Sequence, residues 1–562
     1  MIMDAQETYI SRRQDRFRKT PLNGQALKAL IYAGLTWLRT NQETVNALNV
    51  YPVPDGDTGV NMVLTMQAAY DEIVDSPEHN FGKMIHAVAQ GALMGARGNS
   101  GVILSQIWRG LARGSDEIEV LDGRSLVSAF AEARDTAYKG VGRPVEGTIL
   151  TVAKDVAMAA ENILVETDDP IRILDHVVSE ADESVERTPD LLDVLKKAGV
   201  VDAGGKGLFF ILEGMLRYIN GQPLDTPLVT VQPLSEMVLE DTLETIEPGQ
   251  EFEVVVDFRP DNPLDLKEFY SDLEVMGTSI QVGEGEGLYR MHIHLLTEKL
   301  YEPIEYTRSL GTVIKASMEN LVEQMDEIES RARRSQVDVS PVEKDQIAVI
   351  AVSPGYGISL VFASLGVAGI VEGGQAMNPS TEDIMNAFEN LPTNKVIILP
   401  NNKNIIMAAK SAAELTVKNV AVIPTLTIPQ GLAAMLRLIP DGDFDQVVEE
   451  MNQALEEVHS GQITTAVRNV EIDNVEVQEG QIIALLDGKL VCAAHSLEKA
   501  SLDLLDKAEA DQYELVTLFF GADISRQDAN QIADTIRAAY PNLEVELQDG
   551  GQPHYQFILS IE

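Results

Sequence analysis

The segment Asn49-Val-Tyr-Pro-Val-Pro-Asp-Gly-Asp-Thr-Gly-Val-Asn-Met62 places two aspartates, Asp55 and Asp57, on either side of one glycine. The two prolines before them keep the approach extended and exclude a helix there. The pattern therefore predicts a rigid turn that presents two carboxylates, followed by the start of a helix. Such hard oxygen ligands are what Mg²⁺ takes from a protein when phosphate and water supply most of the others. A solvated Pro/Gly turn is the alternative for Asp-Gly-Asp alone.

A second segment, Gly91-Ala-Leu-Met-Gly-Ala-Arg-Gly-Asn-Ser-Gly-Val-Ile-Leu104, carries glycines that let the backbone approach a ligand closely. It then continues as an apolar, helix-like run, and the positive end of a helix suits phosphate. The Gly-Lys-Ser/Thr ending of a Walker A loop is missing, so the usual strand–loop–helix nucleotide fold is not indicated. A contact between two helices would also explain the glycines. Together with the aspartate turn, a Mg²⁺–nucleotide site is the favoured interpretation.

These two segments resemble the nucleotide-binding DhaL (Dak2) domain of the dihydroxyacetone-kinase family. Further motifs, PVEGTILTVAK at 144–154 and VVDAGGKGL at 200–208, resemble one branch closely, the catalytic subunits of bacterial fatty-acid kinases (the FakA type). Three C-terminal motifs occur in the same order as in that branch: GGQAMNPSTED at 373–383, LPNNKN at 399–404 and GGQPHYQ at 550–556. The resemblance covers most of the chain except its first twenty residues.

The resemblance implies roles for individual residues. Asp55 and Asp57 are expected to hold Mg²⁺, as two ions, with Asn49 near a third metal-directed oxygen. Arg97 is expected either to neutralise charge on the transferred group or to form a surface salt bridge. The residues expected to contact the nucleotide are Thr58, Asn61, Gly98, Asn99, Ser100, Gly101, Gly147, Thr148, Asp202, Gly204 and Gly205. For the Gly147–Thr148 and Asp202–Gly205 turns, plain helix capping is the alternative.

The composition limits the functional classes. The chain has 562 residues and is 45% hydrophobic, so three or four globular domains are expected. Its formal net charge of −45 opposes binding to nucleic acid or to an anionic membrane. A single cysteine, Cys492, excludes an internal disulfide and fits a reducing, cytoplasmic compartment. The sequence shows no signal peptide and no run of about 20 apolar residues that would span a membrane.

Hydrophobic periodicity divides the chain into regions. Residues 1–20 are read as a basic arm, and 21–222 follow helical spacing throughout, which fits the all-helical, ATP-binding barrel of the DhaL family. Residues 245–330 are read as a small α+β middle domain, with strands at 253–258 and 289–295 and helix over 301–330.

Residues 345–562 are read as an α/β domain in which strands and helices alternate. Strands are expected at 347–352, 396–399, 420–424, 464–468, 481–486, 514–519 and 556–561. The resemblance implies a fold like that of the DegV proteins, which bind fatty acids. It also implies that this domain engages a lipid-carrying partner, with the polar loops at 373–381 and 401–404 as docking or remnant ligand loops.

His292 and His294 stand two apart on an expected strand, so their side chains share a face and can bind Zn²⁺ if further ligands arrive. Relatives use such a pair together with a cysteine for a structural metal. This chain departs from them, because Cys492 lies in the C-terminal domain and Glu251 stands near the expected cysteine position. Two histidines on a polar strand face are the alternative to a zinc site.

The sequence therefore predicts an ATP- and Mg²⁺-dependent kinase that phosphorylates a fatty acid held by a separate DegV/FakB-type carrier, giving an acyl phosphate. A carboxylate acceptor is already ionised near neutral pH and needs no general base. Two alternatives remain at this point: a small-molecule kinase like dihydroxyacetone kinase, and a nucleotide-sensing scaffold without catalysis. A homodimer through the middle domain is expected from the resemblance alone.

Overall fold

The computed structural model of the chain forms two compact units. Residues Thr226–Gln336 make up one of them, and the residues before and after together make up the other. The structure describes residues 17, 20–50, 56–224, 232–233, 252–261, 264, 266–285, 288–320, 337–374, 377–466, 470–472, 475–478 and 480–562.

The described residues up to Asn220 are helical, and polar caps start several of the helices. Asn23, Asp122 and Thr148 each accept a hydrogen bond from an amide in the first turn of the helix that follows, which satisfies a donor that the helix itself leaves open. The helices are α2 (Gly24–Thr40), α3 (Gln42–Ala47), α4 (Thr58–Asp71), α5 (Phe81–Met94), α6 (Gly98–Arg113), α7 (Gly123–Gly140), α8 (Ile149–Ile163), α9 (Pro170–Leu191), α10 (Asp193–Ala198) and α11 (Ala203–Asn220).

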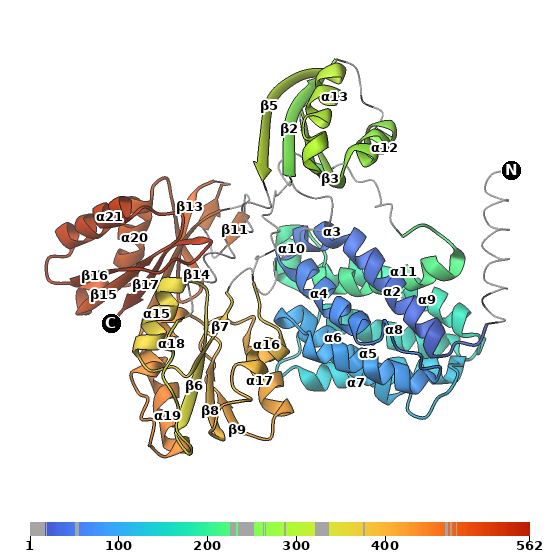
Figure 1. Cartoon of the computed structure of the whole chain (residues 1–562), viewed down its shortest axis with the longest axis horizontal. Coiled ribbons are helices and arrows are strands. Elements are labelled where there is room, and N and C mark those ends of the chain that lie inside the picture. Colours follow the sequence, from blue (N-terminus) through green and yellow to red (C-terminus); the bar gives the residue numbers. More distant parts are fainter. Residues whose placement is uncertain are drawn as a thin grey trace. The chain divides into compact units, whose positions relative to one another are not determined.

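These helices close into a barrel, drawn from blue to green in Figure 1. Neighbours along the chain pack in sequence from α5 to α9, then α9 packs on α11, α11 on α2 and α2 on α5. The apolar faces meet in one continuous core, in which Trp37 and Phe210 are fully buried with their rings edge to face at 6.4 Å. The predicted all-helical barrel is confirmed.

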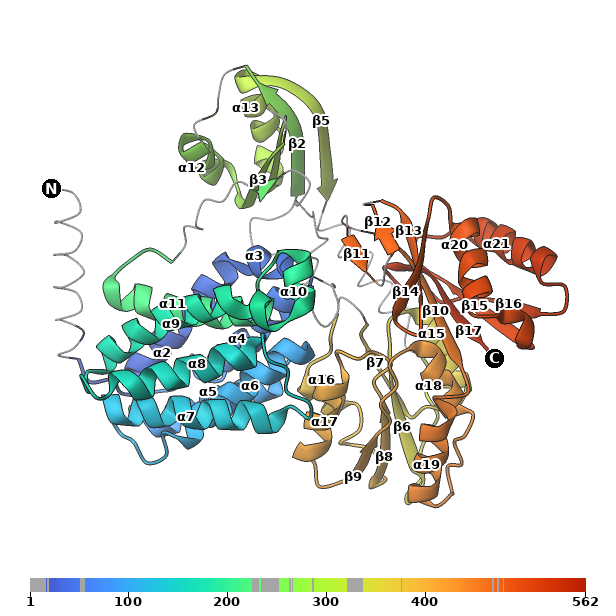
Figure 2. The ribbon, with the colours of Figure 1, turned by 180° about the vertical axis from the view of Figure 1, so that it is seen from behind.

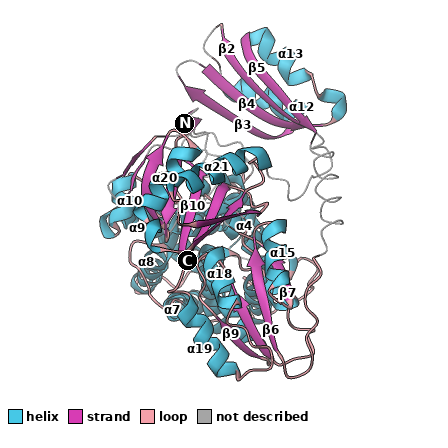
Figure 3. Ribbon diagram, turned by 90° about the vertical axis from the view of Figure 1, so that its left-hand side faces the viewer, coloured by secondary structure: helices cyan, strands magenta, loops and turns pink. Residues whose placement is uncertain are grey.

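The middle unit is a sheet with helices on one face (Figure 3). Its strand order is β1-β3-β4-β2-β5, and α12 and α13 pack on the face that carries Val254, Val256 and Phe258. The elements are β1 (Gln232–Pro233), β2 (Phe252–Pro260), α12 (Leu266–Met276), β3 (Thr278–Gly285), β4 (Leu288–Leu295), the 3₁₀ turn η2 (Thr297–Lys299), α13 (Glu302–Leu310) and β5 (Gly311–Asn320).

The C-terminal region begins with a four-stranded parallel sheet of order β7-β6-β8-β9. All of β6 is buried, as expected for a central parallel strand covered on both faces. The elements are β6 (Ile347–Ser353), α15 (Tyr356–Ser364), β7 (Gly369–Glu372), α16 (Thr381–Asn386), β8 (Lys395–Leu399), α17 (Ile406–Leu415), β9 (Asn419–Val422), α18 (Ile428–Met435) and α19 (Phe444–Ala454).

Alternate residues of β6 face opposite sides of this sheet. Ile347, Val349 and Ala351 pack against α15, α18 and α19, whereas Ala348, Ile350 and Val352 pack against α16 and α17 (Figure 1). The second cluster also contains Ala96 and Val102, from the beginning of α6 in the helical barrel. Two residues of the helical region therefore belong to the apolar cluster on this face of the sheet, which is separate from the barrel's own core.

The chain ends in a six-stranded mixed sheet of order β14-β13-β10-β17-β15-β16, with α20 and α21 packed on one face (Figure 2). A short β11–β12 hairpin lies outside it. The elements are β10 (His459–Thr465), β11 (Val470–Ile472), β12 (Val475–Val477), β13 (Ile482–Leu486), β14 (Lys489–Ala494), α20 (Leu497–Lys507), the 3₁₀ turn η3 (Ala510–Gln512), β15 (Leu515–Phe520), α21 (Arg526–Ala539), β16 (Glu544–Asp549) and β17 (Tyr555–Ile561).

The predicted order of helical, α+β and α/β regions is confirmed, but several elements differ from the prediction. Helix was expected over 301–330, whereas in the described part of this range α13 is followed by the strand β5 at residues 311–320, and residues 321–330 lie outside the described residues. These residues pair along β2 in antiparallel register, and β-branched Thr312, Val313 and Ile314 favour a strand. The strand expected at 464–468 lies at His459–Thr465, and the prediction missed β1, β3, β7, β11, β12, β14 and β16.

Candidate metal and nucleotide site

Asp57 lies at the N-terminus of α4 without capping it. Its side chain makes no capping hydrogen bond, and Asn46 Oδ1 instead accepts from the amides of Gly59 at 2.7 Å and Val60 at 3.3 Å. A Cβ at Gly59 would lie 2.4 Å from the carbonyl oxygen of Gln42, so this approach requires glycine. The Asp57 carboxylate is buried and is held at a helix start whose capping is performed by another residue.

Gly98 brings the beginning of α6 against α4. Its φ of +56° is in the left-handed region, and a Cβ there would lie 2.7 Å from Asn61 Nδ2. Thr65 fastens the same contact, because its hydroxyl donates to the Asn61 carbonyl at 2.7 Å and accepts from the Arg97 amide at 3.3 Å. A Cβ at Gly101 would lie 2.3 Å from that hydroxyl. The glycines at 98 and 101 thus permit close helix packing, as the alternative interpretation of this loop expected.

The turns around Thr148 and Asp202 cap α8 and α11. Thr148 Oγ1 accepts from the Leu150 amide at 3.4 Å, and Asp202 Oδ2 accepts from the Gly205 amide at 2.7 Å. Burial raises the pKa of the Asp202 carboxyl to about 6, partly offset by hydrogen bonds from the amides of Gly205 and Ile149. One carboxyl therefore joins the beginnings of both helices, and a Cβ at Gly204 would lie 3.3 Å from the Cβ of Ile149.

Four helix beginnings thus gather at one end of the barrel. Gly98 of α6 lies against Asn61 of α4, and Gly204 of α11 lies against Ile149 of α8. Gly207 of α11 completes the set, because a Cβ there would lie 2.5 Å from Met62 Sδ of α4. Helix N-termini carry partial positive charge, which attracts phosphate, and α6 begins without a side-chain cap on its first amides. This end of the barrel can therefore bind a polyphosphate beside the Asp57 carboxylate.

The C-terminal region contacts this site directly. Asn378 Nδ2 donates to Asp57 Oδ2 at 2.5 Å, and the Asn378 carbonyl accepts from the Arg97 guanidinium at 3.0 Å. Arg97 also lies 3.6 Å from an Asp383 carboxylate oxygen, and Asn99 Nδ2 donates to Asn404 Oδ1 at 3.0 Å. Asn46 and Asn378 were not among the residues predicted from sequence, since no local signal connects them with Asp57.

The predicted residues divide into four groups. Asp57, Thr58, Asn61 and the 98–101 turn lie together, and Thr58, Asn61 and Asn49 are buried. The capping interpretation of the turns at 147–148 and 202–205 is observed, while their contact with a nucleotide stays a prediction. Asp55 and Glu251 lie outside the described residues. Arg97 forms its ion pair with the C-terminal region, and a role in phosphoryl transfer stays a prediction.

His292 and His294 share a face of β4, as their spacing predicts. Both are buried, and their rings lie 4.8 Å apart at 82°. Among the residues that the structure describes, no group of three or more His, Cys, Asp or Glu side chains is placed to hold a metal ion. The described residues therefore do not supply a zinc site, and Cys492 lies on β14, in the other unit.

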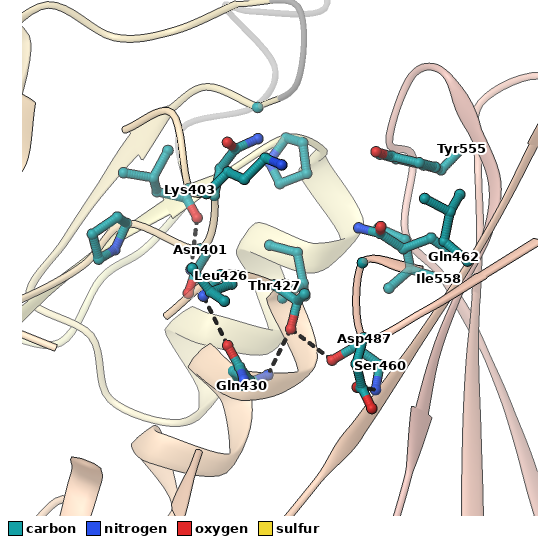
Figure 4. A pocket seen from close by; sticks show the side chains of 18 of the residues that line it. Asn401, Lys403, Leu426, Thr427, Gln430, Ser460, Gln462, Asp487, Tyr555 and Ile558 are labelled. Carbon is teal, nitrogen blue, oxygen red and sulfur yellow. Dashed lines mark hydrogen bonds between the residues drawn. The ribbon is translucent and has the colours of Figure 1, made fainter. Parts of the chain in front are cut away.

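The polar loops at 373–374 and 401–403 line a cavity of about 440 Å³ between the two C-terminal sheets (Figure 4). The other wall comes from the second sheet, whose Ser460 on β10 shares a hydrogen bond at 2.6 Å with Thr427, the cap of α18. Its size is typical of small-ligand sites, which span about 300–1,000 Å³. The cavity wall includes Val352, Asn401, Lys403, Leu426, Gln430, Gln462, Asp487, Tyr555 and Ile558.

Comparisons with protein families match almost the whole chain. Residues 52–217 match the DAK2 domain. Residues 247–328 match the middle domain of the FakA-like fatty acid kinase proteins, and 348–562 match their C-terminal domain. The chain belongs to the FakA-like fatty acid kinase family. The recognition made from the sequence motifs is confirmed.

Two relatives align over nearly the full length, and their names describe them as uncharacterized proteins. A protein of Staphylococcus haemolyticus is 38% identical over 551 residues, covering 96% of this chain and 99% of the relative. A protein of Staphylococcus aureus strain MRSA252 is 38% identical over 550 residues, covering 96% of this chain and 99% of the relative. Both alignments therefore extend across the helical, middle and C-terminal regions of this chain.

Solved structures resemble parts of the chain. A DegV family protein from Corynebacterium glutamicum covers 38% of this chain and 96% of its own, at 17% identity and a TM-score of 0.30. The Streptococcus pneumoniae fatty acid kinase B3 protein, loaded with linoleic acid, covers 33% and 76%, at 14% identity and 0.25. The C. freundii dihydroxyacetone kinase with AMP-PNP and Mg²⁺ covers 34% and 33%, at 15% identity and 0.27. TM-scores this low do not establish a common fold. None of the described helices has the length and apolar character to cross a membrane.

Proposed function

We propose that this chain is the ATP-dependent catalytic component of a kinase that phosphorylates a fatty acid held by a separate DegV/FakB-type carrier, producing an acyl phosphate. The observation that carries the proposal is the gathering of the beginnings of α4, α6, α8 and α11 beside the buried Asp57 carboxylate. Membership of the FakA-like family supports the acceptor and the carrier. The expected cytoplasmic location and homodimer remain predictions.

The residues present fit Mg²⁺. Asp57 offers a hard, buried carboxylate that its own helix does not use as a cap. Asp57, together with Asp55 and Asn49, would hold the ion. When bound, Mg²⁺ neutralises charge on the nucleotide phosphates.

The protein's own part in the reaction is positioning. The beginning of α6 has no side-chain cap, so its first amides can orient phosphate oxygens, while the Asn46 cap holds the start of α4 in place. A fatty-acid carboxylate is ionised near neutral pH and can attack phosphorus without a general base. A carrier would keep the acyl chain out of water while the carboxylate is presented to the nucleotide.

The test is phosphoryl transfer from labelled ATP with Mg²⁺, a fatty acid and a candidate carrier, with Asp57→Asn as the matched variant. Carrier-dependent label in a hydroxylamine-sensitive product, abolished by Asp57→Asn, is the expected result. Transfer to dihydroxyacetone without a carrier would move the assignment to a small-molecule kinase. Tight nucleotide binding without transfer to any acceptor would favour a sensing scaffold.

A further inference from the structure

The C-terminal region inserts one side chain into the Asp57 site. Asn378 is only 2% exposed, and both its side chain and its backbone contact the helical barrel, through Asp57 and Arg97. The residues that follow Asn378 are held in place, because Ser380 and Asp383 form a capping box at the start of α16. The position of the Asn378 amide is therefore set by a short, capped turn.

The surrounding contacts form a packed junction. The Thr381 amide donates to the Ala96 carbonyl at 3.3 Å, on the residue before Arg97. Ala96 and Val102 are buried in one apolar cluster with Ile384 and Phe388, which follow Asn378 in the chain. Shared burial of this kind aligns Asn378 with the beginning of α6.

The Asn378 side chain has one donor in use and one acceptor that the described residues leave open. Its Nδ2 donates to Asp57, while its Oδ1 is buried without a hydrogen-bond partner among those residues. Buried polar atoms nearly always have a partner, so an open oxygen beside a carboxylate points to a missing ligand. An amide oxygen next to a carboxylate oxygen forms the kind of donor set that a hard divalent cation takes.

We propose that Asn378 is a positioning residue of the divalent-cation site, so that the C-terminal domain completes the nucleotide site of the barrel. The amide N–H fixes the orientation of the Asp57 carboxylate, and the amide oxygen faces the cation or its bound water. The inference rests on the proposed function, because it takes Asp57 to be a cation ligand. Binding of the cation at Asp57 and docking of the 377–383 loop on the barrel are then linked, so that each increases the affinity of the other.

The experiment measures Mn²⁺ binding to the full chain by electron paramagnetic resonance and Mg²⁺–AMP-PNP binding by calorimetry. Asn378→Ala is expected to raise the Kd for Mn²⁺ about tenfold, the usual effect of losing an outer-shell partner. Asn378→Asp, which keeps an oxygen, is expected to restore most of the affinity. Asn386→Ala, at an exposed position of α16, is the matched control and is expected to bind like the parent chain.

The outcomes separate this inference from the proposed function. Unchanged or tighter Mn²⁺ binding in Asn378→Ala, with normal binding by the parent, overturns the role of Asn378 alone. Weakened binding that Asn378→Asp does not restore overturns the role of the amide oxygen. No binding by the parent, or equal binding by Asp57→Asn, overturns the proposed site itself. If Asn378→Ala does not fold, Asn378→Ser carries the same test.

Discussion

The buried Asp202 carboxyl makes the helical barrel less stable at neutral pH than at mildly acidic pH. Its pKa rises from 3.8 to about 6 in the folded chain, chiefly because the ionised form is desolvated. This difference between the folded and unfolded pKa corresponds to a free energy of about 3 kcal/mol, at about 1.36 kcal/mol per pKa unit. Because the folded chain binds the proton more tightly, this contribution to stability is complete below pH 3.8 and is lost as pH rises through about 6.

Replacing Asp202 by asparagine removes this pH dependence and keeps the cap, since asparagine caps a helix as well as aspartate does. At pH 7.5 the Asp202→Asn barrel is expected to be more stable than the parent by about 3 kcal/mol, and near pH 4 the difference is expected to approach zero. The chain has two tryptophans, and both Trp37 and Trp108 are buried in the barrel. Urea unfolding followed by tryptophan fluorescence from pH 4 to 7.5 therefore reports on the barrel alone.

A stability difference that stays constant over this pH range would refute the reasoning, because Asp202 would then not be the titrating group. The expected result has a functional implication. Asparagine would cap α11 at no electrostatic cost, so a carboxylate retained at this position at neutral pH indicates a use for its charge. Such perturbed carboxyls are typical of sites that bind ligands, which agrees with the proposed nucleotide site.

Two further predictions concern backbone and charge. Gly98→Ala is expected to destabilise the barrel by about 1–3 kcal/mol and to weaken nucleotide binding, because φ is +56° and the new Cβ would contact Asn61. Gly142→Ala is the control, because a Cβ at Gly142 would meet nothing within 4 Å. Equal urea unfolding midpoints for the two variants would contradict this prediction. Arg290→Met is expected to destabilise the middle unit by about 3 kcal/mol, because it leaves the Asp257 carboxylate, bonded at 2.6 and 2.8 Å, without its partner. Hydrogen exchange along β2 and β4 measures this effect, and unchanged protection would show that the ion pair adds nothing.

Local patterns predicted the elements that local chemistry determines. Thr148 and Asp202 cap helices where polar residues precede an apolar helical run, and the fully apolar β6 lies in the centre of a parallel sheet. Residues 311–320 were read as helix as part of the range 301–330, and the pairing with β2 that makes them a strand is a distant contact. Periodicity describes which face of an element is buried and carries no information about which strand will pair with it.

The candidate site was also predicted only where its contacts are local in the sequence. The Asp57 turn and the glycine loop were recognised from their residues, and their mutual packing follows from glycines that permit it. Asn378 lies 321 residues from Asp57 in the chain, and nothing in the residues near either one indicates the contact. Asn46 was missed for a different reason, since it caps α4 across a turn rather than from the adjacent position.

The distance in sequence between Asp57 and Asn378 has a consequence during synthesis of the protein. At about 5–20 residues per second, a ribosome needs roughly 15–60 s to add the 321 residues that separate them. Once α11 has been made, the barrel lacks the loop that contacts Asp57 until that loop is synthesised, and Ala96 and Val102 lack their apolar cover. A nascent or truncated chain should therefore expose this surface to chaperones, and the finished site can form only after the loop around Asn378 has left the ribosome.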